Sequence, residues 1–264
     1  SAMLLCALKR ILHIKTPPIL DVDISSFHQA YTSGIIHRLS QFSSKAFDYM
    51  VYHTSSQIDY YKDQFPWLVH KSKFIHVGVD YDYWKLKSYP EIKEKDSYIV
   101  CVGYRKRDWD TLLKAYDEAK LKEKLYLIGN PDIKCENKNV VVLPFIPIDK
   151  LMTYIVNAKY SVIPLDDFNY SFGQLTILQQ MAFGVPILAA DVPAIRDYIS
   201  CSDGIISYKP YNIDDLKEKL VKFSKFNKDD MEQMKKNIIA VKTLLSEKRM
   251  ALEFEKICKM LNEQ

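Results

Sequence analysis

Apolar residues gather in short runs along this chain of 264 residues, and most of the runs are continuous rather than alternating. Continuous apolar runs of this length are typical of strands whose two faces are both covered. The runs predict strands at residues 19–23, 49–53, 74–77, 97–102, 125–128, 140–143, 160–164, 186–190 and 204–207.

Segments with helical spacing of apolar positions separate the later strands. They predict helices at residues 108–121, 148–158, 174–183 and 213–226. Strands that alternate with helices of this length form right-handed βαβ units, so the pattern predicts an α/β fold with a parallel sheet and helices on both faces. After residue 226 the strands stop, and two charged helices at 229–245 and 248–261 are expected to wrap back over the sheet.

The first apolar segment, residues 3–14, also has helical spacing and carries Lys9, Arg10 and His13. It is too short to span a bilayer. Two interpretations stay open: a half-buried helix of the fold, which we favour, and a helix that lies on a membrane surface.

A linker is predicted at residues 85–95, which are charged, contain Pro90 and show no apolar period. It divides the chain into a smaller lobe at 1–84 and a larger sheet domain at 85–245. The last helix, within 246–264, is expected to pack back toward the first lobe.

Composition narrows the class of protein. The formal net charge of +4 suits an anionic small ligand or a membrane surface but is too weak to indicate nucleic acid. The five cysteines are scattered and form no C-x-x-C pair, which favours reduced thiols and a cytoplasmic location, with the inner face of a membrane as a further option. No spacing among the six histidines is typical of a metal site.

Two features of the chain predict an anion site. Gly103 directly follows the apolar run at 97–102, and Arg105, Lys106 and Arg107 come next, before Asp108 caps a helix. A glycine at the carboxyl end of a strand admits a ligand, and arginine grips phosphate through two N–H groups. A solvated basic loop is the alternative interpretation of these cations.

The second feature is the helix that begins after Gly173. Free backbone N–H groups at residues 171–174 (Ser171, Phe172, Gly173 and Gln174) would face a ligand, and glycine leaves room for a phosphate to approach them. The positions expected to face the sheet are Leu175, Leu178 and Met181 or Ala182, and those expected to face away are Thr176, Gln179 and Gln180. Gln179 lies roughly 9 Å along the helix, about the span from a diphosphate to its ribose. A surface glutamine is the other interpretation.

Five stretches resemble, in order, the nucleotide-binding domain of GT-B retaining glycosyltransferases of the bacterial polysaccharide-building type. They are KFIHVGVDYDYW, IVCVGYRKRDWDTLLKAY, LYLIGN, VVVLPFIPIDKLMTYIVNAKYSVIPL and SFGQLTILQQMAFGVPILAADVPAIRDYI. The resemblance runs from about residue 49 to residue 199. It implies a Rossmann-like nucleotide-sugar-binding domain at 85–245 and a partial acceptor-side α/β lobe at 1–84.

The resemblance also implies an activity. Such an enzyme moves a sugar from a UDP- or GDP-sugar to a glycan or lipid-linked acceptor with retention, and it needs no metal cofactor. Gly103 would admit the diphosphate, Arg107 and Arg105 would take the place of the family's phosphate-binding cations, residues 171–174 would bind the β-phosphate, and Gln179 would meet the ribose.

The chain departs from the family's usual residues at two places. Where the family carries two glutamates eight positions apart, this chain has Ser171 and Gln179. Where the family often has a histidine in the first lobe, this chain has Asp21-Val22-Asp23, with His28 further on. Asp23 and His28 are therefore candidates to line the cleft, and a capping or loop role is the alternative for each. A non-catalytic module that binds a nucleotide or a partner is the alternative for the whole chain.

Overall fold

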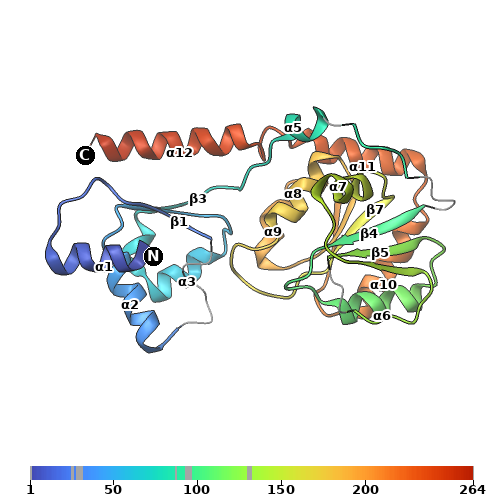
Figure 1. Ribbon diagram of the computed structural model, residues 1–264, viewed down its shortest axis with the longest axis horizontal. Coiled ribbons are helices and arrows are strands. Elements are labelled where there is room, and N and C mark those ends of the chain that lie inside the picture. Colours follow the sequence, from blue (N-terminus) through green and yellow to red (C-terminus); the bar gives the residue numbers. More distant parts are fainter. Residues whose placement is uncertain are drawn as a thin grey trace.

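The computed structural model describes residues 2–24, 27, 32–86, 88–92, 97–129 and 133–263. These residues form two lobes, and each lobe is built on its own parallel sheet (Figure 1). His28 lies outside the described residues.

The larger lobe contains a six-stranded sheet in the order β6-β5-β4-β7-β8-β9, and every neighbouring pair is parallel. The strands are β4 (Tyr98–Val102), β5 (Lys124–Ile128), β6 (Val140–Leu143), β7 (Tyr160–Ile163), β8 (Ile187–Ala190) and β9 (Ile205–Tyr208). Apolar runs in the sequence predicted all six, and the parallel α/β fold is confirmed.

Helices cover both faces of this sheet because successive side chains of a strand point to opposite sides. Ile99 and Cys101 of β4 pack toward α6 (Trp109–Ala119) and α10 (Ile213–Ser224). Tyr98 and Val100 of the same strand pack toward α7 (Ile148–Val156). The remaining helices of this lobe are α8 (Gln174–Ala182), α9 (Pro193–Ile199) and α11 (Lys228–Ala240).

The smaller lobe contains three parallel strands, β1 (Leu20–Asp23), β2 (Tyr49–Tyr52) and β3 (Ser72–Phe74). Aromatic residues fill its core: the ring of Phe27 lies 4.6 Å from that of Phe65 and 6.1 Å from that of Phe47. Its helices are α1 (Ala2–Leu12), α2 (Gly34–Ser44), α3 (Gln57–Gln64) and α4 (Pro66–Val69), and α5 (Tyr81–Leu86) begins the connection to the larger lobe.

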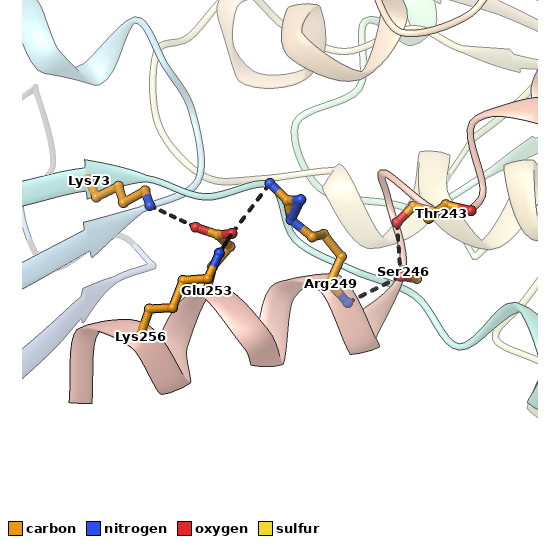
Figure 2. A network of polar contacts seen from close by, with 6 residues as sticks. All are labelled: Lys73, Thr243, Ser246, Arg249, Glu253 and Lys256. Carbon is orange, nitrogen blue, oxygen red and sulfur yellow. Dashed lines mark hydrogen bonds and ion pairs between the residues drawn. The ribbon is translucent and has the colours of Figure 1, made fainter. Parts of the chain in front are cut away.

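The last helix, α12 (Glu247–Asn262), runs from the larger lobe back along the smaller one (Figure 1). Its Ile257 and Leu261 pack against Val51 and Ile75 of the smaller lobe. Glu253 anchors the middle of the helix by accepting a hydrogen bond of 2.7 Å from the Lys73 ammonium, and Arg249 lies 3.3 Å away (Figure 2). The carboxyl-terminal helix therefore ties the two lobes together.

Candidate active site

The strand order places a ligand site at the carboxyl ends of β4 and β7. From β4 the chain continues outward through β5 and β6, whereas β7 lies on the other side of β4 and leads to β8 and β9. Open parallel sheets bind ligands where the strand order reverses in this way. Gly103 follows β4, and residues 164–173 connect β7 to α8. The two sequence features therefore meet at one edge of the sheet.

Backbone hydrogen bonds fix the basic loop against the segment that follows β7. The amide of Asp108 donates to the carbonyl of Pro164 at 2.8 Å, and the amide of Asp166 donates to the carbonyl of Lys106 at 3.2 Å. Asp108 also caps α6 by accepting from the amide of Thr111 at 3.1 Å, as its position in the sequence predicted. The loop is thus held at both ends beside the approach to α8.

The Arg107 side chain is buried beneath this loop, and its N–H groups donate hydrogen bonds to other groups of the protein. Its Nε and Nη2 donate to the carbonyl of Val102 at 3.3 and 3.1 Å, and Nη1 donates to the carbonyl of Arg105 at 3.0 Å. Nη2 also lies 3.4 Å from the hydroxyl of Thr176 in the first turn of α8. Burial lowers the pKa of the guanidinium, although arginine stays protonated in proteins. Arg107 therefore braces the loop and brings a positive charge to the start of α8.

Gly103 is required by this packing. Its φ is +116°, which side-chain-bearing residues rarely adopt, and a Cβ there would lie 2.5 Å from Nη2 of Arg107. The guanidinium therefore occupies the space directly beside the Gly103 backbone, on the side where any other residue would place its side chain.

The start of α8 presents backbone donors. Gly173 is the N-cap residue with φ of +87°, and among the described residues no side chain caps this end. The first N–H groups of a helix have no acceptor within the helix, and the helix dipole makes this end partly positive. The first turn also lies beside the Arg107 guanidinium. Both the helix end and the guanidinium charge therefore attract an anion to this place.

Gln174 fixes the direction of α8 relative to the smaller lobe. Its amide nitrogen donates to the hydroxyl of Thr54 at 3.1 Å and to the carbonyl of Ala194 at 2.8 Å, and its amide oxygen accepts from Ser171 at 3.3 Å. The side chain is buried, with 4% of its surface exposed. The Gln174 side chain is thus structural, and its backbone amide is the group available to a ligand.

A cavity of about 640 Å³ lies over these elements and between the lobes. This size suits a nucleotide-sized ligand. Seven residues proposed from the sequence line it: Gly103, Arg105, Arg107, Ser171, Phe172, Gly173 and Gln174. Gln179 is half-buried and is not among the lining residues.

Asp23 lies beneath the cavity wall rather than in it. Its carboxylate is fully buried and accepts hydrogen bonds from the Tyr61 hydroxyl, from the Gln57 amide nitrogen at 3.2 Å and from the Phe27 amide at 3.3 Å. These contacts fix the turn after β1, in agreement with the capping alternative. The neighbouring Val22 and Ile24 face the cavity instead.

Two orientations expected for α8 are wrong. Leu175 was expected to face the sheet, but 62% of its surface is exposed and it lines the cavity. Gln180 was expected to face away, but it is fully buried. The buried stripe runs through Ile177, Leu178 and Met181 instead. The Gln174 side chain is held by Thr54 and Ala194. The helix is therefore rotated so that the side-chain amides of Gln174 and Gln180 are both buried.

His53 is a cavity residue that the sequence analysis did not single out. Its Nδ1 lies 2.6 Å from the carbonyl of Ile75, which can only accept, so Nδ1 carries the proton and Nε2 is left as an acceptor. Burial lowers the pKa of this imidazole, which favours the neutral form. Its place as the last residue of the strand predicted at 49–53 was the available signal. Tyr104, Thr176, Val77, Met250 and Phe254 also line the cavity without having been proposed.

Among the described residues, no group of three or more His, Cys, Asp or Glu side chains is arranged to hold a metal ion. None of the described helices combines the length and the apolar character needed to cross a membrane.

Comparison with known proteins assigns the family. The sequence model of the family described as Glycosyl transferases group 1 matches residues 50–225, and the chain belongs to this family. It is therefore a glycosyltransferase, and its resemblance to GT-B enzymes is confirmed. A sequence search of curated proteins finds no match.

Solved structures share the fold at low sequence identity. Sucrose-phosphate synthase from Thermosynechococcus elongatus has a TM-score of 0.71 and 16% identity, over 96% of this chain and 70% of that chain. HepE from Anabaena, solved in complex with UDP, has a TM-score of 0.75 and 12% identity, over 100% and 76%. WaaG, a glycosyltransferase of lipopolysaccharide biosynthesis, has a TM-score of 0.67 and 18% identity, over 92% and 75%.

Proposed function

We propose that this glycosyltransferase moves a sugar from a UDP-sugar to a glycan or lipid-linked acceptor, with retention of configuration at the sugar. The observation that carries the proposal is the convergence of the Gly103 loop and the amino end of α8 on one cavity. Both elements offer positive charge and N–H donors to the same space, which is what a diphosphate requires.

The diphosphate is bound by three groups in this proposal. Because α8 begins after Gly173, backbone amides at residues 173–176, rather than the 171–174 expected from the sequence, bind the β-phosphate in this proposal, and the exposed Arg105 reaches the phosphates from the loop. Arg107 contributes its charge from below while its N–H groups hold Val102, Arg105 and Thr176. Because these groups supply the positive charge that the leaving group needs, we propose a reaction without a metal ion.

The same groups assist the chemical step. As the bond between the anomeric carbon and the phosphate oxygen breaks, negative charge grows on the nucleoside diphosphate, and donors already in place stabilise that charge. The acceptor hydroxyl oxygen bonds to the anomeric carbon on the same face, and its proton passes to the departing phosphate oxygen. His53 accepts a hydrogen bond through Nε2 from a hydroxyl of the acceptor and orients that hydroxyl.

Uracil is the base we favour. HepE, which shares the fold, has been solved with UDP and with UDP-glucose, and TarM from S. aureus, a further structure of the same fold, has been solved with UDP. A GDP-sugar is the second candidate donor. The ribose role of Gln179 stays a prediction of the sequence.

A transfer assay tests the proposal. The protein is incubated with UDP-glucose, UDP-N-acetylglucosamine or GDP-mannose, and release of nucleoside diphosphate is followed with and without added glycan acceptors. We expect release from a UDP-sugar, unchanged by a metal chelator. Release from GDP-mannose alone would contradict the choice of base, and release that the chelator abolishes would contradict the metal-free reaction. Binding of UDP without release of any sugar would favour the non-catalytic module.

A further inference from the structure

The two amino-terminal helices turn apolar faces outward. On α1, residues at helical spacing are exposed: Leu4, Leu5, Leu8, Ile11 and Leu12. On α2 the exposed residues are Ile35, Ile36, Leu39 and Phe42. These nine residues are named here the α1–α2 face. The two helices lie in the smaller lobe on the side away from the larger lobe (Figure 1). Such a patch marks an interaction surface because monomeric proteins rarely expose large contiguous apolar areas.

An ordinary surface helix turns its apolar side chains inward, whereas these two helices turn their larger apolar side chains outward. The inward side of α2 buries His37, Ser43 and Ser44, whereas its outward side exposes 84% of Ile35 and 65% of Ile36. Among the described side chains of α1, those that are buried are Cys6 and Ala7. Because the larger apolar side chains point away from the core of this lobe, packing within its described part does not account for them.

The charges of these segments have one sign. Residues 1–20 and 24–47 contain no aspartate or glutamate, and their Lys and Arg residues are Lys9, Arg10, Lys15, Arg38 and Lys45. The guanidinium of Arg10 lies 4.6 Å from the ring of Phe42 in the α1–α2 face, so a cation borders the apolar surface. Lys15 and Arg38 are exposed. The Asp48 carboxylate, just outside these segments, lies 3.8 Å from the Lys9 ammonium.

We propose that the α1–α2 face docks this enzyme on a membrane that contains anionic lipids. Apolar side chains would enter the boundary between headgroups and acyl chains, and the cations would remain at the level of the negative headgroups. The match between the excess of cations in these segments and an anionic lipid surface favours this occupant over a second protein chain. The proposal does not rest on the donor specificity, and it gives a lipid-linked acceptor a route to the cavity.

Vesicle flotation tests the proposal with the full chain and without nucleotide. Vesicles of phosphatidylcholine alone are compared with vesicles that also contain phosphatidylglycerol. The variant I35Q/I36Q removes two exposed apolar side chains from the α1–α2 face, and L244Q/L252Q removes two exposed leucines elsewhere as a matched control. K15Q/R38Q removes two cations.

We expect the wild type and the control to float with the anionic vesicles only. I35Q/I36Q should reduce the bound fraction at least roughly tenfold, since burial of methylene groups drives insertion. K15Q/R38Q should reduce it by about tenfold, and added salt should act in the same direction. Thermal unfolding and UDP titration of each variant should match the wild type because the substituted side chains are exposed and lie outside the cavity.

Three outcomes would overturn the membrane proposal. They are no flotation with either vesicle, equal flotation of I35Q/I36Q and the wild type, and a wild-type dimer in sedimentation velocity that I35Q/I36Q dissociates while vesicles do not bind. The last outcome would identify the α1–α2 face as a contact between copies of the chain. None of the three bears on nucleotide binding, so failure of this inference is distinguishable from failure of the proposed function.

Discussion

Arg105, Lys106 and Arg107 are neighbours in one loop, but they differ in burial, and burial decides which of them can contact a ligand. Arg107 is 8% exposed, and its N–H groups are directed at Val102, Arg105 and Thr176. Arg105 and Lys106 are exposed, but only Arg105 lines the cavity. The sequence predicted a basic loop beside the site, but it gave no means to rank the cations, because burial depends on the loop's contacts with residues 164–166.

Arg105→Gln should weaken UDP binding by roughly tenfold, the cost of one partly exposed charge-assisted hydrogen bond. The matched control is Lys106→Asn, which removes the same charge from the same loop but outside the cavity, and asparagine tolerates the φ of +54° at that position. Isothermal titration calorimetry at low salt measures both. Equal losses in the two variants would show that only the loop's net charge matters.

His53→Asn tests the proposed hydroxyl contact. Asparagine can donate to the carbonyl of Ile75 as Nδ1 does, but it lacks the cavity-facing acceptor. We expect kcat/KM for the acceptor to fall by roughly tenfold while UDP affinity is unchanged. Because burial lowers the pKa of His53 below its ordinary value of 6.5, the wild type should lose this contact only at pH below 6.5. Loss of UDP affinity in His53→Asn would assign the residue to nucleotide binding.

At the scale of elements, the strands were predictable and the helices less so. Among the described residues, eight of the nine strands were expected because buried parallel strands leave continuous apolar runs, whereas β3 at Ser72–Phe74 overlaps the predicted strand 74–77 only at Phe74. The helix α2 was missed because its buried face carries His37, Ser43 and Ser44. The rotation of α8 was wrong because Gln174 and Gln180 are buried. In both helices, polar residues occupy positions where an apolar period is normally sought.

The start of α8 depends on a backbone that only glycine adopts easily. Gly173→Ala should destabilise the fold by about 1–2 kcal/mol because φ is +87° there. It should also weaken UDP binding, since a Cβ would lie 2.8 Å from Cδ1 of Leu165 and shift the first turn. Gly34→Ala is the control: Gly34 has φ of +90° with open space around it, and it does not line the cavity. Thermal unfolding should show a loss of stability in both variants. Calorimetric titration of UDP should show a loss of affinity in Gly173→Ala alone.

At the scale of the whole molecule, contacts between residues far apart in sequence define the site. The hydrogen bond from Gln174 to Thr54 joins residues separated by 120 positions and holds α8 against the smaller lobe. Tyr198 of α9 accepts from the amide of Val77 at 2.9 Å. Periodicity reports local structure and says nothing of such pairs, so the sequence predicted the two halves of the proposed phosphate site but not His53, Met250 or Phe254 around them.

Glu253 makes the attachment of α12 dependent on pH. Hydrogen bonds from Lys73 and then Lys256 lower its pKa from 4.5 to about 2. The folded state therefore binds fewer protons than the unfolded state between these values, so the stabilisation is complete above pH 4.5 and declines as the pH falls toward 2. Glu253→Gln should lower the free energy of unfolding at neutral pH, and its difference from the wild type should shrink below pH 4.5.

Denaturant unfolding at several pH values measures this difference. Glu255→Gln, on the exposed side of the same helix and paired with Lys259, serves as the comparison and should have a smaller effect. A difference between Glu253→Gln and the wild type that is constant with pH would show that shape rather than charge holds the helix.

The proposed activity requires a nucleoside diphosphate to bind where the Gly103 loop meets the start of α8. Calorimetric titration of UDP into the wild type and Gly173→Ala tests this most directly, with Gly34→Ala as the control. We predict saturable binding at one site per chain, weakened in Gly173→Ala and unchanged in Gly34→Ala. Absence of binding of both UDP and GDP to the folded wild type, or equal affinity in all three proteins, would contradict it.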